Sequence, residues 1–339
     1  MRTSAASGVV LQGAYEPAEF ERMVREIDDL GFDHLWLTDS SLHARNPYAY
    51  LTLAARCSDR LALGTAVTNP VTRHPAITAV AMATVDEIAG GRCVLGIGAG
   101  DRPLLALGLR PSSVASLRAT VVAIRALWAG ERVDVDDPAF RLHGAHLRTP
   151  PRPDIPVFVS ASGPRTLELA GEIADGVILL VGLLPEAIAW ALEHVDRGAA
   201  AAGRPRPHVA AFAYGSIDED EHRALASARS IAAWFPQTAP HICRLAGLPP
   251  DLVASVRERY AGGEFQEAAA AAELLPDAFV RSVALAGGSD EAHRRVAGVL
   301  AAGADSVHVF PLGDRRMETV RAFAEVTAAV RRTPAGGEI

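Results

Sequence analysis

The chain has 339 residues, of which 49% are hydrophobic and 22% charged, and its formal net charge is −7. This length and hydrophobic content can build a large core, so they exclude a disordered chain and leave one large α/β barrel or two modest domains. The acidic excess is spread along the sequence rather than gathered in blocks, which argues against nucleic acid as the main partner.

Short apolar strands alternate with amphipathic helices through most of the chain. The first helix is predicted over residues 17–30, where Phe20, Val24 and Ile27 recur at helical spacing, and Gly31 ends it. Because each strand is apolar throughout, the pattern favours a closed parallel TIM (β/α)8 barrel, with an open doubly wound sheet as the alternative. The eight predicted strands lie at residues 9–12, 33–37, 61–67, 92–97, 156–161, 176–180, 208–215 and 306–310.

Two segments interrupt this alternation. Residues 131–147 are predicted to form a β-hairpin with its turn near 136–138, and residues 234–276 a long helical insertion. We therefore expect a single barrel domain over residues 1–332 with insertions, followed by a frayed tail at 333–339. Insertions beside barrel strand ends usually cover the site or form a subunit contact, and we expect a homodimer.

Polar residues follow three of the predicted strands directly. The strand at 33–37 runs into Asp39, the strand at 61–67 enters a loop of hydroxyl groups, and the strand at 92–97 ends in glycines and Asp101. Either aspartate could be an ordinary helix cap or loop carboxylate. However, ligand sites of α/β proteins form at the carboxyl ends of strands, so this arrangement favours an enzyme.

A fourth strand end has the features of an anion site. Ser162 and Gly163 precede a helix that starts at Pro164, and Arg165 adds a positive charge. Unpaired N–H groups at a helix start bind phosphate well, although an ordinary serine cap before proline fits the same residues.

The motifs that the sequence lacks indicate the type of chemistry, and the cysteines indicate the cellular compartment. No metal-ligand spacing, nucleophile elbow or Walker loop occurs in the sequence, so we expect no metal and favour chemistry carried by a cofactor. Cys57, Cys93 and Cys243 are far apart, which predicts reduced thiols. The N-terminus lacks an apolar signal core and no apolar run is long enough to span a membrane. We therefore expect a cytoplasmic protein with no membrane partner.

Four segments together resemble the bacterial luciferase-like superfamily. The resemblance is closest to its branch that uses the deazaflavin coenzyme F420, and within it to the methylenetetrahydromethanopterin reductases. It implies a TIM-like barrel that binds a deazaflavin at the carboxyl ends of its strands. The segments are residues 31–39, 64–75, 94–101 and 160–176.

The resemblance also implies roles for single residues around the cofactor ring. Asp39 matches a carboxylate that contacts the ring region. Ala66 and Val67 match a bulge behind the ring, for which a cis peptide bond is expected. Thr68 and Asn69 match its polar contacts.

The resemblance also implies which residues bind the phosphate of the cofactor and which residue handles a proton in the reaction. Ser162 and Gly163 match the phosphate-binding turn, and Arg165 adds charge beside it. Asp101 matches an active-site acid.

Three positions depart from the resemblance. Many relatives have a histidine directly after the strand-2 aspartate, whereas this chain has Ser40, so His43 is the possible substitute. Gln12 stands where the reductases tend to have an acidic group. Leu183 lies in the segment where sugar-phosphate dehydrogenases have a lysine, which argues against a phosphorylated sugar and for an uncharged or hydrophobic substrate.

The sequence therefore predicts an oxidoreductase that moves a hydride between reduced F420 and a small organic acceptor with a C=N, C=C or C=O bond. Asp101 or His43 would manage the proton, and the protein would contribute mainly positioning. One alternative is an FMN-dependent monooxygenase on the same scaffold. A third possibility is a barrel that binds flavin or another ligand without turnover.

Overall fold

The structure, a computed structural model, describes residues 6–261 and 267–332. The tail expected at residues 333–339 lies outside this part of the chain, as do residues 262–266 of the expected helical insertion. Within the described ranges, no helix is both long enough and apolar enough to cross a membrane.

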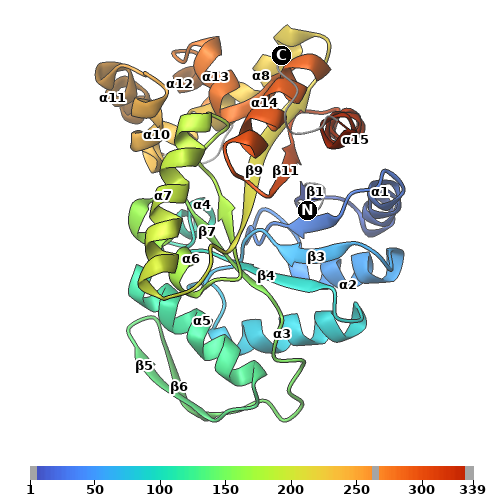
Figure 1. Cartoon of the computed structure of the whole chain (residues 1–339), viewed down its shortest axis with the longest axis vertical. Helices are drawn as coiled ribbons and strands as arrows, with labels where there is room; N and C mark the ends of the chain where they lie inside the picture. The colour runs from blue at the N-terminus through green and yellow to red at the C-terminus, as the bar shows by residue number, and fades with distance from the viewer. Residues whose placement is uncertain (1–5, 262–266, 333–339) are drawn as a thin grey trace. The chain divides into compact units, whose positions relative to one another are not determined.

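Eight parallel strands form a closed barrel of the TIM type, which confirms the predicted fold class (Figure 1). Neighbouring strands follow the order β1, β2, β3, β4, β7, β8, β9 and β11, and β11 pairs with β1. These strands are β1 (Ala6–Leu11), β2 (His34–Leu37), β3 (Ala62–Thr65), β4 (Cys93–Ile97), β7 (Val157–Ala161), β8 (Gly176–Leu179), β9 (His208–Ile217) and β11 (Ser306–Pro311).

Helices alternate with the strands, as the hydrophobic periodicity predicts. The first one ends one residue before the predicted boundary, and Gly31 follows it with a positive φ of 83°. The helices are α1 (Pro17–Asp29), α2 (Pro47–Cys57), α3 (Pro75–Ile88), α4 (Arg102–Leu105), α5 (Val114–Trp128), α6 (Pro164–Ile173), α7 (Pro185–Ala201), α8 (Glu221–Ala232), α9 (Trp234–Thr238), α10 (Pro240–Leu245), α11 (Pro250–Arg259), α12 (Ala269–Ala272), α13 (Asp277–Val283), α14 (Ser289–Ala301) and α15 (Arg316–Arg332).

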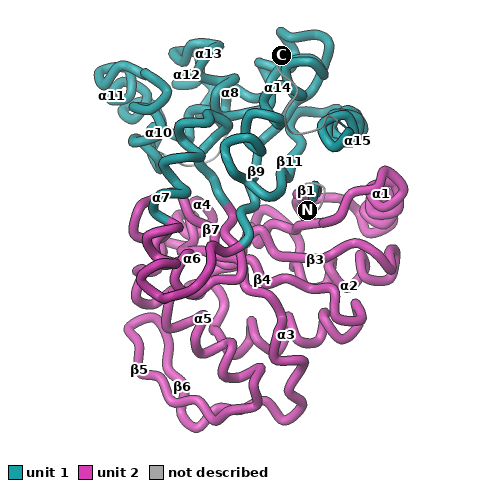
Figure 2. Tube along the Cα trace, in the orientation of Figure 1, with its two compact units in different colours: residues 1–9, 179–194, 208–339 teal, residues 10–178, 195–207 magenta. Residues whose placement is uncertain are grey.

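The chain divides into two compact units, which Figure 2 colours magenta and teal. The magenta unit comprises Val10–Ile178 and Val195–Pro207. The teal unit comprises Met1–Val9, Leu179–His194 and His208–Ile339. The single domain expected over residues 1–332 stays a prediction. All of the predicted site residues belong to the magenta unit, so the site is described within it.

The strands of the magenta unit bring their polar ends to one edge. Leu35 lies opposite Leu63 in the parallel ladder, Leu63 opposite Cys93, and Leu95 opposite Val157. All five side chains are buried, which anchors β2, β3, β4 and β7 in one register. Because the strands are parallel, the residues that follow each of them emerge on the same side.

In the teal unit, β9 pairs with β11 and, at its far end, with a strand that the sequence did not predict. This strand, β10 (Ala284–Gly287), lies opposite residues 214–217 of β9. Its sequence of two alanines, a leucine and a glycine lacks β-branched residues, so only the pairing with β9 identifies it as a strand. The predicted helical insertion contains α9, α10, α11 and α12 in its described part.

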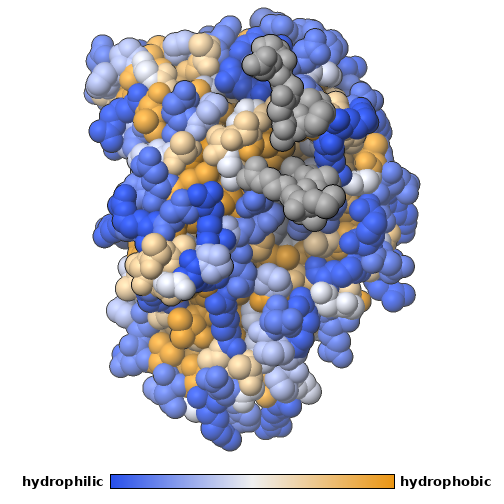
Figure 3. Space-filling view, in the orientation of Figure 1, coloured by the Kyte–Doolittle hydropathy of each residue, from blue (hydrophilic) through white to orange (hydrophobic). Residues whose placement is uncertain are grey.

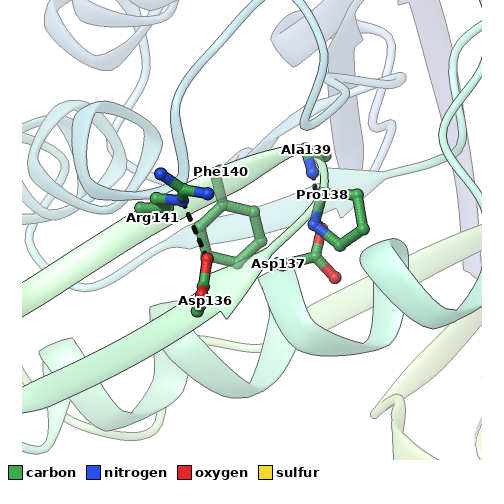
Figure 4. A pocket seen from close by; sticks show the side chains of 6 residues that line it. All are labelled: Asp136, Asp137, Pro138, Ala139, Phe140 and Arg141. Atoms are coloured by element: carbon green, nitrogen blue, oxygen red, sulfur yellow. Dashed lines mark hydrogen bonds and ion pairs between the residues drawn. The ribbon is translucent and has the colours of Figure 1, made fainter.

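The predicted hairpin is also present in the magenta unit. β5 (Val133–Asp137) pairs antiparallel with β6 (Phe140–Ala145), and the turn lies at residues 138–139, one residue beyond the predicted span. Asp136 and Arg141 form an ion pair of 2.8 Å beside a hollow that only residues 136–141 line (Figure 4). This hollow contains none of the predicted site residues.

Candidate functional site

Asp39, at the end of β2, is held by a bidentate ion pair with Arg73. The Asp39 side chain is only 1% exposed. Arg73 Nε donates to Asp39 Oδ2 at 2.5 Å and Nη2 donates to Oδ1 at 2.9 Å. Thr68 donates its hydroxyl proton to Oδ2 at 2.8 Å. Asp39 is therefore the centre of a polar cluster that joins the end of β2 to the segment after β3.

The segment after β3 leaves the sheet and returns to it. The Ala66–Val67 peptide bond is cis, as expected from the resemblance. Ala66 N–H donates to Leu37 O at 2.7 Å on one side. Beyond the cis bond, Thr68 N–H donates to Gly96 O at 3.0 Å. The predicted strand at 61–67 is thus shorter, ending at Thr65, because the chain forms a bulge between β2 and β4.

Two glycines of the β4 segment allow close approach of the backbone. A Cβ atom at Gly96 would lie 1.9 Å from Thr65 O, and one at Gly98 would lie 3.0 Å from Val67 Cγ2. The glycines therefore let the bulge pack directly against β4, with Val67 over Gly98.

Asn69 organises the loop that follows the bulge. Its Oδ1 accepts hydrogen bonds from Val71 N at 3.0 Å and from Thr72 N at 2.8 Å. Since only a carbonyl oxygen can accept both bonds, the amide Nδ2 group lies on the other side of the side chain. Asn69 is buried as a residue, so it is a fixed part of this loop.

Tyr48 of α2 completes the cluster and was not identified from the sequence. The Arg73 guanidinium carbon lies 5.2 Å from the centroid of the Tyr48 ring, within the range of cation–π interactions. Burial raises the pKa of Tyr48 to about 12, with a further contribution from the charge of Asp39, so Tyr48 stays a neutral phenol. Arg73 was likewise not identified as a site residue from the sequence.

Asp101 follows β4 and is the N-cap residue of α4, although its side chain makes none of the usual N-cap hydrogen bonds. Although the residue is exposed, desolvation by the surrounding protein raises the pKa of its carboxyl group. The charge and the backbone N–H of Arg102 oppose this rise. Asp101 is thus a carboxyl group whose proton is held more tightly than usual.

The other two predicted catalytic residues lie at neighbouring strand ends. Gln12 directly follows β1 and is partly exposed. His43 lies in the turn after β2, exposed to solvent, and its N–H donates to Ser40 O at 3.1 Å. The structure places both at the edge where the ligand site is expected, and their roles stay predictions.

The predicted anion site lies at the start of α6. Gly163 is the N-cap residue, Pro164 is the first helical residue, and no side chain of the described residues caps this helix. A Cβ atom at Gly163 would meet nothing within 4 Å, so the space in front of the helix is open. Arg165 is exposed in the first turn. The N–H groups of this turn remain available for an anion.

His74 has a structural role at the other end of the loop. Its Nδ1 accepts a hydrogen bond from Ala76 N at 3.2 Å and so caps α3. Its Nε2 lies 3.1 Å from Arg141 O of the hairpin, and its ring meets Phe140 edge-on. His74 therefore fixes the loop to α3 and to β6 rather than facing a ligand.

The residues present fit a flavin-type ring with a phosphate tail. The bulge and the glycines of β4 offer a flat apolar surface, and α6 offers an anion site. Three buried hydroxyl groups, of Thr38, Tyr48 and Ser112, have no hydrogen-bond partner among the described residues, which suits a polar ligand nearby. The same residues contain no group of three or more histidine, cysteine and acidic side chains suited to a metal ion.

A closed barrel of parallel strands with helices between them defines the chain as an α/β-barrel protein of the TIM type. The family model described as luciferase-like monooxygenase matches residues 3–306. The chain therefore belongs to the luciferase-like family.

Similar proteins include two curated reductases. The chain is 38% identical over 245 residues to the 5,10-methylenetetrahydromethanopterin reductase of Archaeoglobus fulgidus, which covers 71% of this chain and 73% of that protein. It is 31% identical to the reductase of the same name from Methanolobus tindarius, over 86% of this chain and 90% of that protein.

A solved structure extends the similarity to nearly the whole chain. The coenzyme F420 dependent tetrahydromethanopterin reductase of Methanopyrus kandleri superposes with a TM-score of 0.84 at 26% identity. The match covers 96% of this chain and 99% of that one. The fold is thus shared with an F420-dependent reductase.

Proposed function

We propose that this protein is an oxidoreductase that transfers a hydride between reduced coenzyme F420 and a small organic acceptor with a C=N, C=C or C=O bond. The observation that carries the proposal is the bulge after β3, where Val67 packs over Gly98 beside the buried Asp39 cluster. The similar proteins with this fold include methylenetetrahydromethanopterin reductases. F420, when bound, supplies the hydride. The protein contributes binding, orientation and the proton.

Two groups of residues would hold the cofactor. Around the ring, the apolar bulge would support one face and the polar cluster would meet its edge, through Asp39, Ala66, Val67, Thr68 and Asn69. The phosphate would lie at the start of α6, where the positive end of the helix dipole and a nearby positive charge favour an anion, through Ser162, Gly163 and Arg165.

Asp101 would supply the proton that the acceptor takes up with the hydride. A carboxyl group with a raised pKa keeps its proton closer to neutral pH, which suits a general acid. His43 is the second candidate, and Gln12 would orient the acceptor through its amide. Since this chain has Leu183 in the segment where sugar-phosphate dehydrogenases have a lysine, we propose an uncharged or apolar acceptor.

A cofactor titration tests the proposal. Reduced F420 is expected to bind at least about tenfold more tightly than reduced FMN. The motivation is the reductase-like bulge together with Ser40, which replaces the histidine found in many relatives. Tighter binding of FMN with oxygen consumption would favour the monooxygenase. Binding of either cofactor without hydride transfer to any acceptor would favour a non-catalytic barrel.

We further propose a homodimer that forms through α3. Ile77, Val80 and Ile88 are 60%, 48% and 44% exposed and follow one another along one face of this helix. Val122 of α5, which packs beside α3, is 56% exposed, and Figure 3 shows apolar side chains at the surface over α5. Exposed apolar stripes of this kind are typical of subunit contacts. The three free cysteines support a cytoplasmic location for this assembly.

The double variant Ile77→Asp/Val80→Asp is expected to be monomeric, because two carboxylates would have to be buried in the contact. Light scattering coupled to gel filtration measures the mass. Leu245→Asp is the matched control, since Leu245 is 42% exposed on a different helix. A wild-type protein that elutes as a monomer, or a double variant that stays dimeric, would contradict this interface.

A further inference from the structure

Three hydrogen-bonded side chains connect β9 to β11 in the teal unit. His208 is the first residue of β9, and its Nε2 lies 2.8 Å from Oγ of Ser306, the first residue of β11. His308 Nε2 lies 2.9 Å from the same oxygen. Ser306 and His308 are 0% and 1% exposed, and His208 is half-buried. The serine hydroxyl group therefore lies between two imidazole rings and away from water.

This hydrogen-bonded chain lies on the face of the sheet that is turned away from α15. In the parallel ladder of β1 and β11, Ser7 lies opposite Val307. Arg331 of α15 donates to Ser7 Oγ at 3.0 Å, so α15 covers the face that carries Ser7 and Val307. Because neighbouring residues of a strand point to opposite faces, Ser306 and His308 point away from α15.

The hydroxyl group of Ser306 limits how many protons the two rings can carry. It has one proton to donate and two lone pairs with which to accept. When both rings are neutral, one ring donates its Nε2 proton to Ser306 and Ser306 donates to the other ring, so every group is paired. When both rings are charged, each Nε2 donates to Ser306, and the serine proton is buried with neither ring able to accept it. An unpaired buried donor is costly, so this geometry suits one extra proton but not two.

The surroundings favour His208 as the ring that takes up the extra proton. Burial lowers the pKa of His208, and the charge of Asp305 opposes this effect. Asp305 directly precedes β11, and its Oδ2 accepts from Val209 N at 2.8 Å. His308 is more deeply buried, and its ring centroid lies 5.0 Å from that of Phe212. A carboxylate thus acts on one ring, whereas an apolar ring packs against the other.

The neighbouring elements add few other titratable groups. β1 and β8, the outer neighbours of β11 and β9, carry no titratable side chain. Arg331 of α15 lies on the opposite face of the sheet. His34 of β2, the remaining histidine on a barrel strand, belongs to the magenta unit and stacks on Trp36 with 5.7 Å between ring centroids. Asp305 is therefore the charge to which His208 responds.

We propose that His208, Ser306 and His308 form a pH-sensitive lock between β9 and β11: the lock takes up one proton, on His208, and Ser306 keeps His308 neutral, so that a second proton enters only when the two strands separate. In the unfolded chain both rings titrate freely, at about pH 6.5. The unfolded state then binds more protons than the folded state below this pH. Stability is therefore fully present above about pH 6.5 and is lost as the pH falls below it.

Denaturant unfolding of wild type and His308→Gln, from about pH 7.5 to about pH 5, tests the lock. Glutamine can form a hydrogen bond with Ser306 but does not take up a proton. The ratio of the unfolding equilibrium constant of wild type to that of the variant is expected to rise about tenfold for each pH unit below about 6.5. His222→Gln is the matched control, since His222 is an exposed residue of α8 in the same unit. Its ratio is expected to stay constant, and the same rise in this control would overturn the proposal.

NMR spectra of the folded wild-type protein, labelled with 13C at histidine Cε1, provide a second test over the same pH range. The signal of His308 is identified by its through-space contact with the ring of Phe212. We expect it to stay at its neutral position, whereas the signal of His208 titrates. Asp305→Asn keeps an oxygen acceptor for Val209 N but removes the charge, so it is expected to lower the midpoint of the His208 titration.

A His308 signal that titrates in the folded protein would overturn the proposal, because the second proton would then enter without separation of the strands. A stability ratio for His308→Gln that does not change with pH would also overturn it, since a histidine with a purely structural role gives that result. If His308→Gln does not fold, the spectra of the wild-type protein decide the question.

Discussion

Asp101→Asn is expected to lower kcat by about a hundredfold or more, while the Kd of F420 changes by no more than about twofold. Asparagine has nearly the shape of aspartate, so the start of α4 should be preserved. It cannot give up a proton, however, and the acceptor needs one when it takes the hydride. Stopped-flow measurement of F420 oxidation gives kcat, and fluorescence titration gives Kd.

The pH profile provides a second test of Asp101. Desolvation raises the pKa of its carboxyl group, so the protonated form persists to higher pH than in an exposed aspartate. If Asp101 is the acid, kcat is highest below this raised pKa and falls as the pH rises through it. In Asp101→Asn this fall should be absent, because no group is left to lose the proton.

His43→Gln is the matched comparison, since His43 is the other candidate for the proton. It is expected to keep most of the wild-type kcat and the same alkaline limb. Full turnover of Asp101→Asn at every pH, combined with a large loss in His43→Gln, would move the acid role to His43.

Gly96→Ala is expected to lower the free energy of unfolding by about 3 kcal/mol, in the upper part of the range for overpacking. The added Cβ would lie 1.9 Å from Thr65 O, so β3 and β4 must separate. Gly96 O also accepts from the Thr65 hydroxyl at 2.6 Å and from Thr68 N at 3.0 Å. The same shift should displace Thr68 and weaken F420 binding. Denaturant unfolding and F420 titration measure the two effects.

Alanine substitutions at two other glycines serve as comparisons for the predicted loss of stability in Gly96→Ala. Gly163→Ala should leave stability unchanged, because its added Cβ meets nothing within 4 Å and its φ of −100° suits alanine. Gly98→Ala should be intermediate, since its Cβ would lie 3.0 Å from Val67 Cγ2, the end of a side chain. A wild-type stability for Gly96→Ala would mean that the β3–β4 spacing adjusts freely.

The sequence by itself determined the barrel and the edge at which the proposed site lies. Runs of apolar residues and the helical spacing of Phe20, Val24 and Ile27 depend only on near neighbours in the chain, so they predict elements well. Parallel strands place their carboxyl ends together, and this brought Asp39, Thr68 and Asp101 to one edge before any contact was known. The short strand β10 was missed because its alanine-rich sequence carries no local strand signal.

Only the tertiary structure decided which of these polar groups bind one another. Asp39 and Arg73 are 34 positions apart, and nothing in the intervening sequence indicates that they form a bidentate pair. His74, the next residue along the chain, caps α3 instead of joining this cluster. A buried carboxylate takes the nearest donor with the right geometry, and that distance is set by how β2, β3 and α2 pack, which local sequence patterns do not encode.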